Sequence, residues 1–172
     1  MLDKGMKIYI LVASVICAIT SGVFALTPTP LNSLVWVFFL SFTISSATPH
    51  KVKEIPNLFF SQMAGWGWAM LMYFICVYTM KLGGNLGLGL FLAILIGSII
   101  MLLVHFKFLM NTWFNNISMI YAAICTFFGT QNFSIIIYIM IALTAGSVLC
   151  ALVDPICGLF MKSDLVKEPD KA

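Results

Sequence analysis

Six apolar stretches, separated by short polar connectors, occupy nearly the whole chain and constrain its fold more than any other feature. They cover residues 8–26, 31–47, 58–80, 86–104, 112–128 and 133–153. A helix needs roughly 20 apolar residues to cross the hydrocarbon of a bilayer, and each stretch approaches that length. Since lipid offers no partners to backbone polar groups, each stretch is predicted to be a helix. The expected fold class is all-α, a polytopic membrane bundle of six transmembrane helices.

The composition excludes a soluble domain. Hydrophobic residues make up 62% of the 172 residues and charged residues only 9%, whereas charged residues are about a quarter of a typical soluble domain. Six spans leave room for one membrane domain over residues 1–161, followed by a short charged cytoplasmic tail over residues 162–172. The lysines are dispersed rather than clustered, so we expect no nucleic-acid partner.

The lysines also indicate the orientation. If the amino terminus is cytoplasmic, eight of the nine lysines lie on the cytoplasmic side and only Lys81 lies on the other. Such a bias follows the positive-inside rule and predicts that both termini are cytoplasmic. An alternative is that the first stretch is a secretory signal cleaved near Ala25, which would leave five spans.

Uncharged polar residues in the third and fifth stretches are the candidate functional site, because polar side chains are costly within a bilayer. Asn111, Asn115 and Ser118 recur at helical spacing, and Asn57 and Ser61 follow the same course. The stripes would face either a path for a polar solute or another helix. Both alternatives apply to Gln62, Trp66, Trp68, Asn115, Asn116 and Ser118.

Other polar residues have simpler interpretations. Asn57 and Asn111 are predicted to cap helix starts. His50, His105 and Asp154 are expected at the cytoplasmic membrane edge, and Pro155 after Asp154 is typical of a helix stop. Together with Cys157 these three residues form an alternative metal site, but their spacing does not support it. We therefore expect no metal or other cofactor, and the five cysteines are interpreted as packing residues.

A weak internal repeat appears when the chain is shifted by 54 positions. The shift aligns Asn57 with Asn111 and Phe60 with Phe114, and it aligns the second stretch with the fourth. Both copies of the pattern would start from the cytoplasmic side, so the sequence predicts a parallel repeat of the kind found in some transporters.

The chain also resembles a family of small bacterial inner-membrane proteins catalogued as domain of unknown function 1097. The likeness rests on the six spans, on Trp36 and Phe39, on the amide, glycine and aromatic residues of 57–68, and on Phe127-Phe128-Gly129. It would cover nearly the whole chain. The resemblance implies a multi-pass protein of the bacterial inner membrane and implies no activity.

These observations predict a channel or transporter for a small uncharged or weakly polar solute, because no charged residue falls near the middle of any stretch. We expect no enzymatic activity. The expected partners are the lipid bilayer, the solute and further copies of the chain in a homo-oligomer. The alternative is an accessory or structural subunit whose polar stripe binds partner helices and which transports nothing itself.

Overall fold

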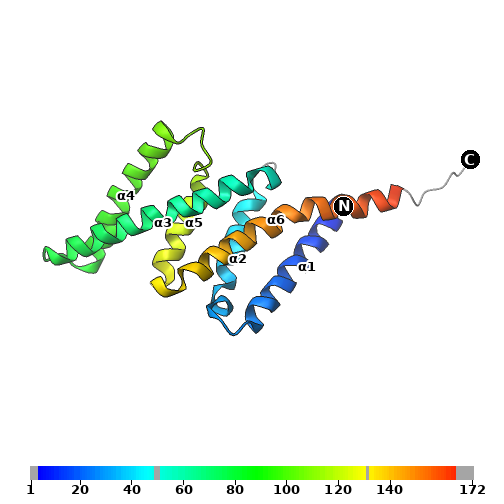
Figure 1. Ribbon diagram of the computed structural model, residues 1–172, viewed down its shortest axis with the longest axis horizontal. Coiled ribbons are helices and arrows are strands. Elements are labelled where there is room, and N and C mark those ends of the chain that lie inside the picture. Colours follow the sequence, from blue (N-terminus) through cyan, green and yellow to red (C-terminus); the bar gives the residue numbers. More distant parts are fainter. Residues whose placement is uncertain (1–3, 49–50, 131, 166–172) are drawn as a thin grey trace, which may run out of the picture. The chain divides into compact units, whose positions relative to one another are not determined.

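The structure is a computed structural model that describes residues 4–48, 51–130 and 132–165. Regular secondary structure in these ranges is entirely helical, as the all-α prediction requires (Figure 1). The elements in chain order are α1 (Lys4–Leu26), η1 (Pro30–Leu34), α2 (Val35–Ser46), α3 (Lys51–Lys81), α4 (Leu86–Phe108), α5 (Ile117–Thr130), η2 (Phe133–Ile135) and α6 (Ile136–Leu165).

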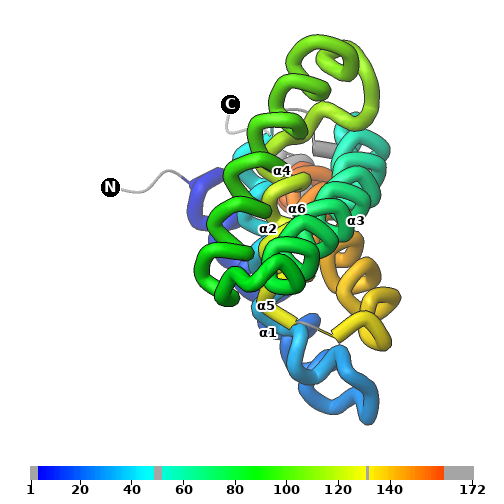
Figure 2. The backbone as a smooth tube through the Cα atoms, turned by 90° about the vertical axis from the view of Figure 1, so that its left-hand side faces the viewer, coloured from blue at the N-terminus to red at the C-terminus, as the bar shows by residue number. Residues whose placement is uncertain are grey.

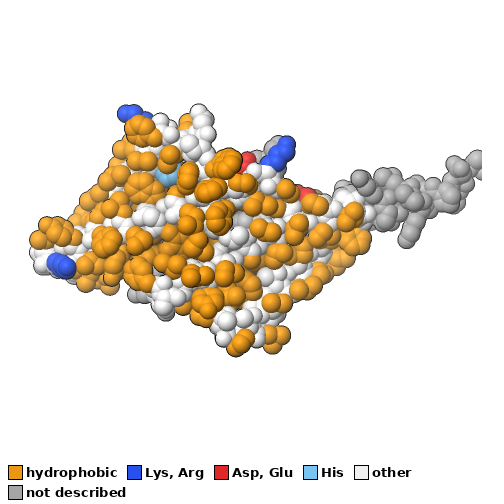
Figure 3. All heavy atoms as spheres, in the orientation of Figure 1, with side chains coloured by type: hydrophobic (Ala, Val, Ile, Leu, Met, Phe, Trp, Pro, Cys, Tyr) orange, Lys and Arg blue, Asp and Glu red, His pale blue; other side chains and the backbone are white. Residues whose placement is uncertain are grey.

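Four of the helices, α1, α3, α4 and α6, are long and apolar enough to cross a membrane. The shortest of them, α1 and α4, have 23 residues each, or about 35 Å at about 1.5 Å per residue. The hydrocarbon of a bilayer is about 30 Å thick. The surface seen in Figure 3 is mainly hydrophobic, and side chains such as Phe74 and Phe91 are each 61% exposed. Lipid is the solvent that such a surface suits.

The other two helices are shorter than the predicted spans. α2 has 12 residues and α5 has 14, which correspond to about 18 and 21 Å. The apolar stretch 31–47 begins in the 3-10 turn η1, and the stretch 112–128 begins in a non-helical connector. Hydropathy alone does not separate these connectors from the helices, so two of the six predicted spans were too long.

The predicted caps Asn57 and Asn111 are wrong. α3 starts at Lys51 and continues through Pro56, which lies in its second turn and removes a single backbone donor. Asn57 is therefore inside the helix. Asn111 lies six positions before α5, and the cap is instead Asn116, whose Oδ1 accepts a hydrogen bond from the N–H of Met119 at 2.9 Å.

The chain forms two compact units. Unit 1 comprises Met1–Ile55 and Ile141–Ala172, and unit 2 comprises Pro56–Met140. Among the described residues, unit 1 thus contains α1, α2 and most of α6, and unit 2 contains most of α3, with α4 and α5. Figure 2 follows the backbone of unit 2 from α3 into α4 through a tight turn. Gly83 allows this turn because its φ is +91°, a conformation that favours glycine.

The helices form a tandem repeat that the sequence prediction missed. Adding 82 to the residue numbers converts the bounds of α1 into those of α4 and converts the start of α2 into that of α5. Each short helix follows an eight-residue connector, residues 27–34 in the first repeat and 109–116 in the second. The third helices correspond as well, since 82 residues separate the start of α3 from the start of η2, which leads directly into α6.

The sequences of α3 and α6 support this repeat. When 81 is added to the numbers of residues 64–81, seven of the eighteen positions are identical. The identical pairs are Ala64 and Ala145, Gly65 and Gly146, Leu71 and Leu152, Ile75 and Ile156, Cys76 and Cys157, Met80 and Met161, and Lys81 and Lys162. The predicted shift of 54 is wrong, because it pairs α3, with 31 residues, with α5, with 14.

Candidate functional site

The best-defined polar region of unit 2 surrounds the crossing of α3 and α5. At Gly65 the two helices touch: a Cβ atom there would lie 2.6 Å from the carbonyl oxygen of Ile120 and 2.7 Å from Cβ of Ala123. Only glycine fits this position without displacement of the backbone. The crossing therefore places the side chains of α3 on either side of Gly65 against α5.

Ser61 and Gln62 lie one turn before Gly65 and are both buried. The Oγ of Ser61 accepts a hydrogen bond from the backbone N–H of Asn116 at 2.9 Å and donates one to Oδ1 of Asn57 at 3.2 Å. Gln62 is only 1% exposed. Ser61 thus links the start of α5 to α3, and Gln62 carries an amide into the interior of unit 2.

Trp66 lies one turn beyond Gln62 and is also buried, 7% exposed. Its ring packs edge-on against Phe127 of α5, with ring centroids 5.4 Å apart. The indole Nε1 is buried and has no hydrogen-bond partner among the described residues. A buried donor without a partner is uncommon in folded proteins and marks a position where a polar ligand or water would gain a hydrogen bond.

Trp68 lies on a different side of α3 and contacts α4. Its indole N–H donates a hydrogen bond to Nε2 of His105 at 3.0 Å. The accepting nitrogen therefore carries no proton, and a neutral ring has its proton on Nδ1. His105 is in the last turn of α4, near the helix end where the sequence predicts it, and its side chain is fully buried. It serves to join α3 and α4.

The remaining predicted residues are not brought into this region. Asn115 is in the connector before α5, and its Nδ2 donates to the carbonyl oxygen of Met110 at 2.5 Å. Ser118 is exposed in the first turn of α5. The predicted stripe from Asn111 through Asn115 to Ser118 is therefore wrong, because its first two members precede the helix.

The helix stop predicted at Asp154 and Pro155 is wrong. α6 does not stop at Asp154 and Pro155 but continues to Leu165, into the predicted tail, and Asp154 is exposed on it. Cys157 is buried in an apolar cluster with Val12 and Val153 of unit 1. His50 lies outside the described residues. Within the described ranges, no group of three or more His, Cys, Asp or Glu side chains could hold a metal ion.

Unit 1 contains a hydroxyl cluster that the sequence analysis missed, made of Ser41 and Ser45 of α2 and Ser147 of α6. Ser41 Oγ lies 2.9 Å from Ser147 Oγ, and Ser45 Oγ donates to Ser147 Oγ at 3.1 Å. Both Ser41 and Ser147 also donate to the carbonyl oxygen of Leu143. The spacing of Ser41 and Ser45, four residues apart, was the available signal.

This cluster lies beside a crossing like that in unit 2. A Cβ on Gly146 would lie 2.5 Å from the carbonyl oxygen of Phe38 and 2.8 Å from Cβ of Ser41. Gly146 corresponds to Gly65 in the repeat, and Phe38 and Ser41 correspond to Ile120 and Ala123. Equivalent residues thus make the same contact in each unit.

Comparisons of the chain with protein-family models, with curated proteins and with solved structures found no match. The resemblance to the family of bacterial membrane proteins therefore stays a prediction. Function has to be argued from the helices and the side chains themselves.

Proposed function

We propose that the protein is a transporter or channel for a small uncharged or weakly polar solute, built from two repeats of opposite orientation. The observation that carries this proposal is the pair of short helices, α2 and α5, at corresponding positions of the two repeats. In transporters with internal repeats, a pair of short or interrupted segments at corresponding positions is the best pointer to the binding site.

The same repeat supports a topology. Each repeat has two long helices with a connector and a short helix between them. In the proposed topology, the connector and the short helix together form the second crossing. With three crossings in each repeat, the chain would enter the two repeats from opposite sides of the membrane. With the lysine distribution, this supports a topology in which both termini are cytoplasmic.

The buried polar groups support a neutral solute. Buried polar side chains of the described residues are hydroxyl, amide and imidazole groups, and no Lys, Asp or Glu is among them. A path lined by such groups offers hydrogen bonds but no fixed charge to neutralise an ion. The indole N–H of Trp66, which has no partner among the described residues, would suit a solute that accepts a hydrogen bond.

The topology is tested by single cysteines labelled from outside intact cells, in a variant that lacks the native cysteines. Cysteines at Thr29, Gly84 and Thr130 should react with a membrane-impermeant maleimide, and cysteines at Val52 and Met110 should not. Labelling at Val52 together with protection at Gly84 would show that the chain has the opposite orientation in the membrane.

Transport is tested by osmotic light scattering with proteoliposomes, using urea and glycerol as neutral probes and potassium chloride as an ionic one. We expect entry of a neutral probe to be faster than in protein-free vesicles, and to be slowed by Gln62→Leu but not by Asn115→Leu, which changes a connector amide. If no probe enters faster and Gln62→Leu only lowers thermal stability, the accessory-subunit alternative replaces the transport proposal.

A further inference from the structure

Unit 1 has an apolar groove between α1 and α6 with a lysine at one end. Its volume is about 540 Å³, within the range of sites that hold small ligands. The lining residues are Lys4, Ile8, Leu11, Val12, Val15 and Ile16 of α1, with Ile156 and Phe160 of α6.

The spacing of the α1 residues makes a continuous stripe. Lys4, Ile8, Leu11 and Val15 follow one another at intervals of four, three and four residues, so they lie on one face of the helix. The stripe from Lys4 to Ile16 is about 18 Å long at about 1.5 Å per residue, close to the hydrocarbon thickness of one leaflet, which is about 15 Å. One end is cationic and the rest is apolar.

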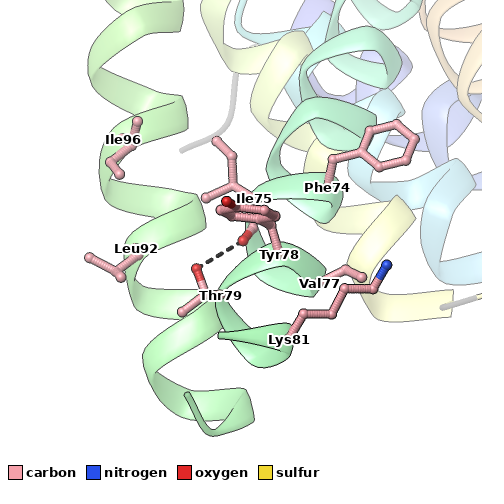
Figure 4. Close-up of a pocket in the computed structure, with 8 residues that line it drawn as sticks. All are labelled: Phe74, Ile75, Val77, Tyr78, Thr79, Lys81, Leu92 and Ile96. Atoms are coloured by element: carbon pink, nitrogen blue, oxygen red, sulfur yellow. Dashed lines mark hydrogen bonds between the residues drawn. The ribbon is translucent and has the colours of Figure 1, made fainter. Parts of the chain in front are cut away.

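The equivalent helices of unit 2, α3 and α4, enclose a groove of the same volume, about 540 Å³. Ile75 and Thr79, which line it, correspond in the repeat to Ile156 and Phe160. This groove also includes a lysine, Lys81 in the last turn of α3. Figure 4 shows the side chains that line this groove, with Tyr78 and Lys81 on α3 and Leu92 and Ile96 on α4.

We propose that the groove between α1 and α6 binds an anionic phospholipid, with one acyl chain along the stripe and the phosphate beside Lys4. Lys7, one turn further along α1, is also exposed and adds positive charge near the same end. Basic residues at the cytoplasmic end of a membrane helix attract anionic headgroups. Two other occupants fit the groove less well. An uncharged acyl chain would leave the lysine without a role, and a partner helix that spans both leaflets would need an apolar surface about 30 Å long.

The site goes beyond the proposed transport function and does not depend on it. Native mass spectrometry of the full-length protein in detergent can measure binding of phosphatidylglycerol, phosphatidylcholine and oleate. We expect phosphatidylglycerol to bind most tightly. Lys4→Gln should weaken its binding about fivefold, the equivalent of about 1 kcal/mol for one lysine near a membrane surface. Lys53→Gln, an exposed lysine that lines neither groove, is the matched control.

A second variant tests the acyl-chain part of the site. Leu11 is 65% exposed and lines the groove, so Leu11→Trp should fill the groove without disturbing the core and should weaken phosphatidylglycerol binding with both lysines intact. Equal binding of phosphatidylglycerol and phosphatidylcholine would overturn the proposal. So would binding of phosphatidylglycerol that neither variant weakens, or oleate binding as tight as that of phosphatidylglycerol.

Discussion

Unit 1 has hydroxyl groups where unit 2 has apolar or aromatic side chains, at three equivalent positions beside the helix crossing. The pairs are Ser41 and Ala123, Ser45 and Phe127, and Ser147 and Trp66. In unit 1 the hydroxyls satisfy one another and a carbonyl oxygen, whereas in unit 2 an indole N–H is left without a partner among the described residues. The backbone contact at glycine is common to both units, and the chemistry beside it is not.

This difference separates two kinds of constraint. Close approach of two helices requires a glycine at the crossing and tolerates variation beside it, so the two repeats keep Gly65 and Gly146. The hydroxyl network of unit 1 stabilises packing, whereas the buried indole N–H of unit 2 has no hydrogen-bond partner among the described residues. Under the proposed transport function, we propose that the solute contacts unit 2 and that the hydroxyl cluster is mainly structural.

The largest expected effect is at the shared crossing. Gly65→Ala and Gly146→Ala should each lower the free energy of unfolding by about 1–3 kcal/mol, because the new Cβ overlaps a backbone carbonyl. Gly67→Ala is the matched control, since nothing lies within 4 Å of its Cβ position, and it should gain up to about 1 kcal/mol in helix propensity. Thermal unfolding in detergent measures all three. Equal losses of stability for Gly65→Ala and Gly67→Ala would contradict the conclusion that the close contact at Gly65 requires glycine.

The next effect distinguishes the units. Ser147→Ala removes the acceptor of Ser45 and should cost about 0.6–1.7 kcal/mol, the range of hydrogen bonds between membrane helices. Ser46→Ala should cost less, because the Ser46 hydroxyl is exposed and bonds only within its own helix. Urea or detergent denaturation can compare them. A neutral Ser147→Ala would mean that the hydroxyl cluster does not hold α2 to α6.

A third effect concerns how the short helices start. Asn116→Ala should destabilise the protein by about 1 kcal/mol through loss of the cap on α5. The equivalent residue of unit 1 is Leu34, which makes no side-chain cap, and α2 instead follows the 3-10 turn η1. Asn115→Ala is the control, and a stability loss as large as that of Asn116→Ala would contradict the assigned cap.

The smallest expected effect on stability is at Trp66. Trp66→Phe removes a buried donor that has no partner among the described residues, so it should cost only the packing lost with the smaller ring. Trp68→Phe makes the same change of ring and also deletes the bond to His105, so it should cost about 1 kcal/mol more. If the Trp66 N–H contacts the solute, Trp66→Phe should still slow its entry into proteoliposomes. Normal entry with Trp66→Phe would move the solute contact away from this indole.

Much of the fold was predictable from apolar length alone. The start of α4 and the end of α1 agree with the predicted stretches, because long apolar runs bounded by turn residues leave little freedom. The start of α3 was not predictable from Pro56, since neighbouring turns of the helix compensate for one missing backbone donor. The start of α5 was obscured by an apolar connector that contains Trp113 and Phe114.

The site was less predictable, because it depends on which helices touch. Gln62 and Trp66 were singled out for their polarity and depth, and both are buried as expected of residues that face the protein interior. The pairings of Trp68 with His105 and of Ser61 with Asn116 join different helices, and a sequence pattern along one helix does not contain them. The identities between α3 and α6 were visible in the sequence but needed the helix bounds to be recognised.

Each unit combines the first two helices of one repeat with the third helix of the other repeat, and this has a consequence for biogenesis. Unit 1 takes α1 and α2 from the start of the chain but is completed only by the part of α6 that begins at Ile141, about 95 residues after α2 ends at Ser46. At about 5–20 residues per second, a ribosome makes that length in about 5–20 s. Throughout this interval, Ser41 and Ser45 lack Ser147 of α6 as a hydrogen-bond partner. We therefore expect the insertion machinery to stay in contact with α2 until α6 has been synthesised.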